Sequence, residues 1–171
     1  MDTVSFVKTD EISNKIEVLF EVEKEKISHL FPAAKIEHIS GTSVSGSISK
    51  GDLDINVRVK PEDFEKITEI LRGLYKINQL DNWTNGFRSF KDDSHNLGIQ
   101  LTVISSADDH FVVQRDYLRS HPKEVLKLNA LKEKVWMNTE EKKGSSLRIS
   151  ILNYKSLKIF FSIPFSLVSN Q

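Results

Sequence analysis

The stretch Gly51-Asp52-Leu53-Asp54-Ile55-Asn56-Val57-Arg58-Val59 decides the fold of this chain. Its apolar residues alternate with polar ones, which is the pattern of a β-strand with one buried face. Because side chains alternate along a strand, Asp52 and Asp54 are expected on the same side, opposite the apolar positions. Two carboxylates held that close favour a cation between them. The stretch therefore predicts a strand that begins with an acidic, metal-binding pair.

A loop rich in glycine and hydroxyl residues precedes this strand: Ser40-Gly41-Thr42-Ser43-Val44-Ser45-Gly46-Ser47. Open backbone amides and hydroxyls, followed by acids, suit a metal-bound phosphate group. Each part also has a simpler interpretation, because paired acids at a strand start are often a solvated turn and a Gly/Ser loop alone is usually only a turn. The residues alone leave both interpretations open.

The composition excludes several classes of protein. Among 171 residues, 24 lysines and arginines balance 24 aspartates and glutamates, which argues against a general nucleic-acid binder. The chain has no cysteine, so disulfides, thiolate metal sites and thiol nucleophiles are all excluded. The start lacks the pattern of a signal peptide, and no apolar run is long enough to span a bilayer. We therefore expect a cytoplasmic protein without a membrane partner.

Helical and extended patterns alternate along the chain without repeats. Helices are predicted over residues 10–31, 61–74, 111–118 and 122–135. Strands are predicted over residues 35–39, 51–59, 75–80, 87–90 and 97–104. This order indicates an α/β (α+β) domain over residues 1–137. The apolar remainder, residues 138–171, predicts a C-terminal helical extension packed on the same domain, with a membrane-surface helix as the weaker alternative.

Two blocks of the sequence resemble the GrpB family. The first is His38-Ile39-Ser40-Gly41-Thr42-Ser43-Val44-Ser45-Gly46 with Lys50 and Asp54 after it, which is similar to the family's His-Ile-Gly-Ser-Thr-Ser-Val-Pro-Gly and later Lys and Asp. The second is Arg115-Asp116-Tyr117-Leu118-Arg119-Ser120-His121-Pro122 and then Leu131-Lys132, similar to Arg-Asp-Tyr-Leu-Arg-x-His-Pro and Leu-Lys. The resemblance covers residues 6–136 and implies a nucleotidyltransferase-like mixed β-sheet flanked by helices.

The chain also resembles the wider nucleotidyltransferase superfamily, which has a turn, then a spacer and then a strand with an Asp-x-Asp motif. Gly41-Thr42 stands at the turn, residues 43–51 form the spacer, and Asp52-Leu53-Asp54 follows. In such enzymes the two carboxylates hold magnesium against the nucleotide phosphates. The resemblance thus implies Asp52 and Asp54 as metal ligands and catalytic carboxylates, with Mg²⁺ as cofactor and a nucleoside triphosphate as partner.

The residues around this pair are candidate phosphate contacts. Gly41, Thr42 and Ser43 would bind phosphate through backbone and hydroxyl groups, and Lys50 would add positive charge. His38 would contact the substrate or orient the loop. A purely structural histidine explains His38 equally well, and an exposed loop lysine explains Lys50 equally well. For the arginines of the second block, an ion pair with Asp116 on the same helix is the competing explanation.

The sequence also departs from the pattern of an active superfamily member, which commonly places a third carboxylate on a neighbouring strand. Here the polar face of residues 98–104 offers Gln100 and Thr102, which do not ionise near neutral pH. The same positions lack the His-x-His pattern of most GrpB sequences. Conversely, Asp52 replaces a residue that is often apolar in the family, so this chain has two acidic residues where the family pattern requires one.

Two hypotheses follow. The leading one is a protein that binds a metal-nucleotide and transfers a nucleoside monophosphate to a small molecule or a protein. The alternative is a non-catalytic accessory or protein-interaction domain that retains the fold, with the apolar C-terminal segment as a contact for homo-oligomers. No motif specifies the base or the acceptor.

Overall fold

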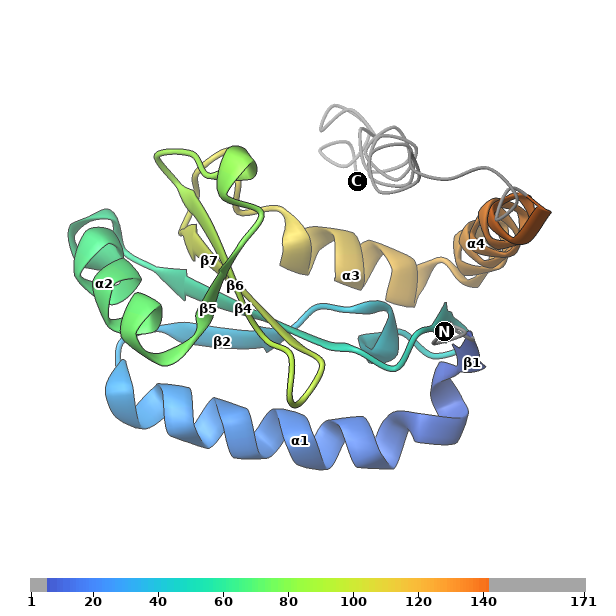
Figure 1. The fold of residues 1–171 in the computed structure, drawn as a ribbon, viewed down its shortest axis with the longest axis horizontal. Helices are drawn as coiled ribbons and strands as arrows, with labels where there is room; N and C mark the ends of the chain where they lie inside the picture. Colours follow the sequence, from blue (N-terminus) through green and yellow to red (C-terminus); the bar gives the residue numbers. More distant parts are fainter. Residues whose placement is uncertain (1–5, 142–171) are drawn as a thin grey trace. The chain divides into compact units, whose positions relative to one another are not determined.

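The structure is a computed structural model, and it describes residues 6–141 (Figure 1). In chain order the strands and helices are β1 (Val7–Lys8), α1 (Thr9–Leu30), β2 (Lys35–His38), β3 (Ile48–Ser49), β4 (Leu53–Val59), α2 (Phe64–Leu74), β5 (Lys76–Asn78), β6 (Phe87–Asp92), β7 (Leu97–Val103), α3 (Phe111–Ser120) and α4 (Pro122–Glu141). Every predicted helix and strand up to residue 135 is present. The short strands β1 and β3 were not predicted.

A five-stranded mixed sheet forms the centre of the fold. Its strand order is β2-β4-β7-β6-β5, in which β4 and β7 run parallel and every other neighbouring pair is antiparallel. This arrangement confirms the predicted mixed sheet flanked by helices. The two-residue strands β1 and β3 form a separate antiparallel pair. They fix the start of α1 beside the glycine-rich loop, because the backbone N–H of Thr9 donates to the carbonyl of Ser47 at 2.9 Å.

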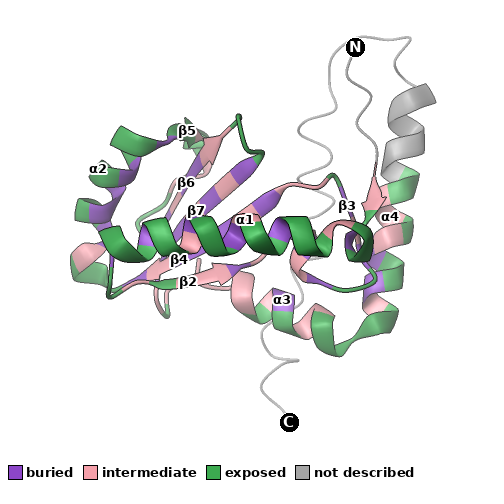
Figure 2. Cartoon of the chain, turned by 90° about the horizontal axis from the view of Figure 1, so that it is seen from below, coloured by how far each residue is buried: buried purple, intermediate pink, exposed green. Residues whose placement is uncertain are grey.

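One face of the sheet is apolar and carries the core. The alternating residues of β4 and β7 on this face are fully or almost fully buried: Leu53, Ile55, Val57, Val59, Ile99 and Leu101. Buried residues of α1 and α2 complete the same cluster, namely Ile16, Phe20, Ile27, Phe64, Ile67 and Leu71. Figure 2 shows α1 running across the strands with its buried positions toward them and its exposed positions outward. The apolar side chains that recur along the helices and along the strands therefore pack together in one layer.

The opposite face of the sheet is polar. The strand register places one polar residue from each strand in a continuous row: Glu37, Asn56, Gln100, Ser89 and Asn78. Helix α3 lies on this side, across the sheet from α1 (Figure 1). Its contacts there include an ion pair between Arg115 and Glu37 at 2.8 Å and the rings of Phe111 and Phe87, which lie 5.9 Å apart.

Two compact units divide the chain, Met1–Leu126 and Lys127–Gln171, and the division falls within α4. The predicted extension over residues 138–171 and its homo-oligomer contact fall almost wholly outside the described residues, so they stay predictions. No helix within residues 6–141 combines the length and the apolar character needed to cross a membrane.

Candidate functional site

Asp54 occupies a position that the neighbouring strand has to leave open. It stands opposite Gly98 in the parallel β4–β7 pairing. A Cβ atom on Gly98 would overlap Oδ1 of Asp54, so a side chain at this position would displace the carboxylate. The side chain of Gln100, one step further along the same face of β7, forms a hydrogen bond with the carboxylate. Glycine and glutamine on β7 together provide the space and the orientation for Asp54.

The charge of Asp54 is destabilised where it stands. Burial, and then the neighbouring carboxylate of Asp52, raise the pKa of Asp54 to about 7, while the hydrogen bond from Gln100 acts in the opposite direction. Asp52 itself is half-buried, and its Oδ1 accepts a hydrogen bond from Ser49 Oγ at 3.1 Å. The predicted pair therefore exists as two coupled carboxylates at the start of β4, an arrangement that a divalent cation would stabilise.

The acidic pair fits a cation that takes most of its ligands from elsewhere. Across the part of the chain that the structure describes, no group of three or more His, Asp or Glu side chains could enclose a metal. Mg²⁺ commonly keeps several waters and binds one or two carboxylates together with substrate phosphates. Asp52 and Asp54 match this donor set, whereas a metal that requires a protein cage would not fit.

The strand β7 supplies no third acid. Thr102 is fully buried, and its Oγ1 accepts a hydrogen bond from Nδ2 of Asn56 at 2.9 Å. The same Nδ2 donates to the carbonyl of Gln100 at 2.8 Å. The backbone carbonyl of Gln100 and the hydroxyl of Thr102 are thus both bonded to Asn56, a residue of the polar row. In this region they serve as hydrogen-bonding groups that order the sheet.

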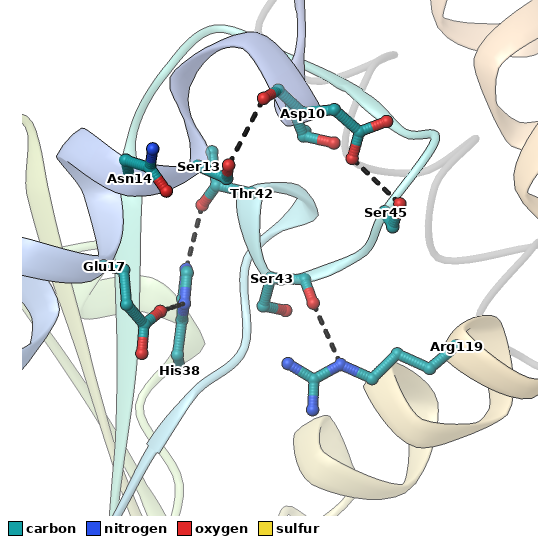
Figure 3. Close-up of a pocket in the computed structure, with 10 residues that line it drawn as sticks. Asp10, Ser13, Asn14, Glu17, His38, Thr42, Ser43, Ser45 and Arg119 are labelled. Atoms are coloured by element: carbon teal, nitrogen blue, oxygen red, sulfur yellow. Dashed lines mark hydrogen bonds and ion pairs between the residues drawn. The ribbon is translucent and has the colours of Figure 1, made fainter.

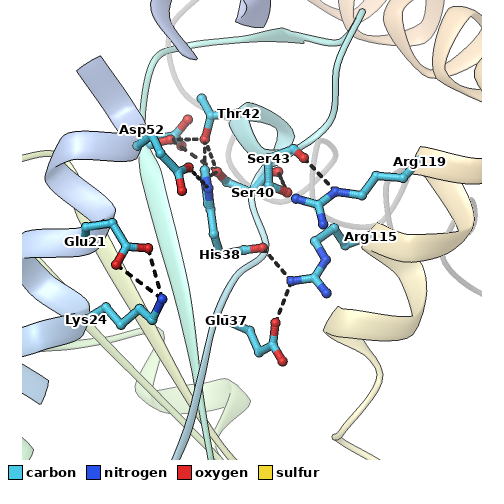
Figure 4. A network of polar contacts seen from close by, with 11 residues as sticks. Glu21, Lys24, Glu37, His38, Ser40, Thr42, Ser43, Asp52, Arg115 and Arg119 are labelled. Carbon is cyan, nitrogen blue, oxygen red and sulfur yellow. Dashed lines mark hydrogen bonds and ion pairs between the residues drawn. The ribbon is translucent and has the colours of Figure 1, made fainter. Parts of the chain in front are cut away.

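The glycine-rich loop is tied to the acidic strand through its hydroxyl groups (Figure 4). It folds into a short 3-10 turn, Gly41–Ser43. Thr42 Oγ1 donates to the backbone carbonyl of Asp52 at 3.0 Å, and it also contacts Nε2 of His38 at 2.9 Å. Ser43 Oγ donates to the carbonyl of Ser40 at 2.6 Å. Both predicted phosphate-binding hydroxyls therefore already have partners within the protein, Thr42 on the acidic strand and His38, and Ser43 within the loop.

The buried side chain of His38 orients this loop through contacts with Ser40 and Thr42. Its ring is almost fully buried, stacks on Phe20 with 5.3 Å between ring centroids, and also contacts Ser40 Oγ at 3.1 Å. Burial, followed by the positive charges of Arg119 and Arg115, lowers the pKa of His38 to about 4. The imidazole is thus neutral at neutral pH. The sequence left two roles open for His38, contact with the substrate and orientation of the loop. These contacts favour the second role.

Two arginines of α3 bind the end of β2 and the loop that follows it. Nη1 of Arg115 donates to the carbonyl of His38 at 3.0 Å and to Glu37 at 2.8 Å (Figure 4). Nε of Arg119 donates to the carbonyl of Ser43 at 2.9 Å. The expected ion pair with Asp116 is also present, at 2.8 Å from Arg115 and 3.9 Å from Arg119. The sequence predicted this pair but not the contacts of Arg115 with β2 and of Arg119 with the loop.

A polar pocket of about 300 Å³ opens beside the loop (Figure 3). Its lining comes from the first turns of α1, from the loop and from α3: Thr9, Asp10, Ser13, Asn14, Glu17, His38, Thr42, Ser43, Ser45 and Arg119. The α1 residues were missed, although Asp10, Ser13, Asn14 and Glu17 form a polar stripe at helical spacing. That stripe was the signal available in the sequence.

The predicted site residues therefore divide into two groups. His38, Thr42 and Ser43 line the pocket. Asp52 and Asp54 lie at the start of β4 and are not part of its lining, and neither are Gly41 and Lys50. Lys50 is exposed. The hydrogen bond from Thr42 to the carbonyl of Asp52 joins the two groups.

Comparison with known proteins agrees with this architecture. The family model described as GrpB protein matches residues 7–158. A UPF0157 protein of Vibrio cholerae serotype O1 is 32% identical over 133 residues, which cover 77% of this chain and 71% of that protein. The crystal structure of the conserved protein GrpB from Enterococcus faecalis superposes with a TM-score of 0.65 at 18% identity, covering 92% of this chain and 99% of that one. At this identity the structural match supports the fold alone.

Proposed function

Because this chain belongs to the GrpB family, we propose that the acidic start of β4 binds a magnesium ion together with a nucleoside triphosphate. The observation that carries the proposal is the Asp52–Asp54 pair, with the space that Gly98 leaves for the second carboxylate. A bound cation would offset both the burial of Asp54 and its repulsion by Asp52.

The residues have distinct roles in this proposal. Asp52 and Asp54 would hold the metal, and Gln100 would orient Asp54 through its hydrogen bond. Lys50, which is exposed, would add positive charge near the phosphates. Gly41, Thr42 and Ser43 would approach the phosphates mainly through the backbone, because the two hydroxyls already donate to the carbonyls of Asp52 and Ser40. When bound, the metal would neutralise charge on the phosphates during an in-line attack.

Transfer of the nucleoside monophosphate to a small molecule or a protein would be the activity of such a site. A specific observation favours a second candidate, in which nucleotide is bound but not transferred. The place of the third carboxylate on β7 is taken by Gln100 and Thr102, and Thr102 is buried against Asn56. A chain without that acid would serve as an accessory or interaction domain that keeps the fold.

Calorimetry with ATP, GTP, CTP and UTP in excess magnesium tests the proposed binding. We expect the wild type to bind at least one nucleotide, and the nearly isosteric variant Asp54→Asn to bind it at least about tenfold more weakly. Asp81→Asn, at an exposed acid on another turn, is the matched control and should bind as the wild type does. Absence of binding by the wild type, or equal binding by Asp54→Asn, would reject the proposal.

A second measurement separates the two candidates. Pyrophosphate release from the bound nucleotide, in the presence of candidate acceptors, reports transfer. Release that is lost in Asp54→Asn supports a transferase. Binding without release supports the accessory domain.

A further inference from the structure

We propose that the pocket between α1, the loop and α3 binds a small zwitterion, a ligand with an ammonium group at one end and a carboxylate or phosphate group at the other. The pocket is distinct from the proposed metal site, because neither Asp52 nor Asp54 lines it, but it adjoins the proposed phosphate contacts, since Thr42 and Ser43 are part of its lining. Three segments far apart in the sequence build its walls (Figure 3). Their side chains place opposite charges on different walls.

The α1 wall supplies a carboxylate that the surrounding side chains do not neutralise. The partner of Glu17 is Nδ1 of His38, 3.9 Å away, and that imidazole is neutral at neutral pH. Asp10, by contrast, is already engaged, since it accepts hydrogen bonds from Ser45 Oγ at 2.8 Å and from the backbone N–H of Gly46 at 3.2 Å. Glu17 is thus the carboxylate that remains for a ligand ammonium group.

The α3 wall supplies a cation that is already oriented. Nε of Arg119 donates to the carbonyl of Ser43, and this bond directs the guanidinium toward the pocket (Figure 3). Nη1 lies 3.9 Å from the nearest carboxylate oxygen of Asp116, which is beyond hydrogen-bonding distance. The side chain of Arg119 is 47% exposed. Its remaining N–H groups are therefore open to a carboxylate or phosphate, which guanidinium binds in a planar, bidentate manner.

The size and polarity of the pocket further restrict the class of ligand that it can bind. A volume of about 300 Å³ lies at the lower end of the range for small-molecule sites. The remaining lining is made of hydroxyl and amide groups, without an aromatic side chain other than the imidazole. A short, polar ligand of amino-acid size matches this lining, whereas a nucleobase would find no stacking surface.

A series of ω-amino acids, from glycine to 6-aminohexanoate, tests the proposal with the folded full-length protein. Amide resonances of residues 10–17 and 40–45 are followed by NMR during titration. We expect at least one member to produce saturable shifts, with an optimum chain length that reports the separation of the charges. Phosphoethanolamine is the parallel arm and distinguishes a phosphate ligand from a carboxylate one. Butanoate and butylamine, which carry a single charge, should bind at least about tenfold more weakly.

Variants locate the two charges. Glu17→Gln and Arg119→Gln should each weaken binding by about tenfold or more. Glu21→Gln, one turn further along α1, and Arg72→Gln, on α2, are matched controls outside the pocket and should bind as the wild type does. Asp54→Asn should also bind as the wild type does, which separates this site from the proposed metal site. Three results would overturn the proposal: no saturable shift with any zwitterion, equal binding of butanoate or butylamine, or undiminished binding by both pocket variants.

Discussion

Nη1 of Arg115 lies 3.0 Å from the backbone carbonyl oxygen of His38, across a separation of 77 residues. The two residues open the two sequence blocks that resemble the GrpB family. The contact shows that these blocks form one structural unit, in which α3 holds the loop that precedes the acidic strand. Arg119 extends the same unit through its bond to Ser43. The arginines therefore support the candidate site from outside, because Arg115 fixes the end of β2 and Arg119 fixes the backbone of the loop.

Replacing Arg115 by alanine should destabilise the fold. The side chain is largely buried, and the change removes its hydrogen bonds to the His38 carbonyl and to Glu37. We expect a loss of about 2–4 kcal/mol in the free energy of unfolding, measured by urea denaturation. Arg72→Ala, at an exposed arginine paired with Glu69, is the control and should cost less than about 1 kcal/mol. Equal effects of the two substitutions would contradict the role given to Arg115.

Gly98→Ala tests whether Asp54 depends on the space above Gly98. The added methyl group would overlap Oδ1 of Asp54 and force the carboxylate to move. We expect a loss of about 1–3 kcal/mol in stability, and most of this loss should disappear in the Asp54→Ala background. Gly73→Ala, at a helical glycine with nothing near its Cβ position, should be neutral or stabilising. A double-mutant cycle without coupling between positions 54 and 98 would show that the overlap is relieved elsewhere.

The buried imidazole of His38 should make the fold sensitive to acid. Its pKa is lowered from 6.5 to about 4, so between these pH values the histidine is protonated in the unfolded chain and neutral in the folded chain. The contribution to stability is complete above about pH 6.5 and is lost as the pH falls toward 4. Over this interval the wild type should lose about 2–3 kcal/mol more than His38→Gln, measured by urea denaturation at several pH values. Parallel pH profiles of the two proteins would argue against a neutral, buried His38.

Asp54 should have the opposite effect on stability. Its pKa is raised from 3.8 to about 7, so protonation favours the folded chain. The contribution is complete below about pH 3.8 and is lost as the pH rises to 7. In a chelating buffer near pH 8, Asp54→Asn should therefore be more stable than the wild type by about 2–4 kcal/mol. Added magnesium should narrow this difference, and a less stable variant in the chelating buffer would contradict the raised pKa of Asp54.

The secondary structure could be predicted well because its signals are local. Alternation alone indicated a strand over residues 97–104, and the structure has β7 at Leu97–Val103. The helix predicted over residues 10–31 is observed at Thr9–Leu30, before Pro32. Strands β1 and β3 were missed because two residues cannot show a period, and their pairing joins segments far apart in the chain.

The candidate site could be predicted only in part, because its key relationships depend on three-dimensional register. Asp54 was identified from its strand, but the requirement for Gly98 follows from the register of β4 against β7. The contacts of Arg115 with β2 and of Arg119 with the loop depend in the same way on where α3 docks. The roles of Asp52, Asp54 and Lys50 in binding metal and phosphate stay predictions.

Direct binding of Mn²⁺ tests the central claim, that the Asp52–Asp54 pair holds a divalent cation. The free ion is followed by electron paramagnetic resonance during titration of the protein near pH 8 and near pH 6. We predict one bound ion in the wild type, affinity that falls about tenfold for each pH unit below 7 because Asp54 must lose its proton, and no binding by Asp54→Asn. The same free Mn²⁺ concentration with the wild type and with Asp54→Asn at both pH values would contradict the claim.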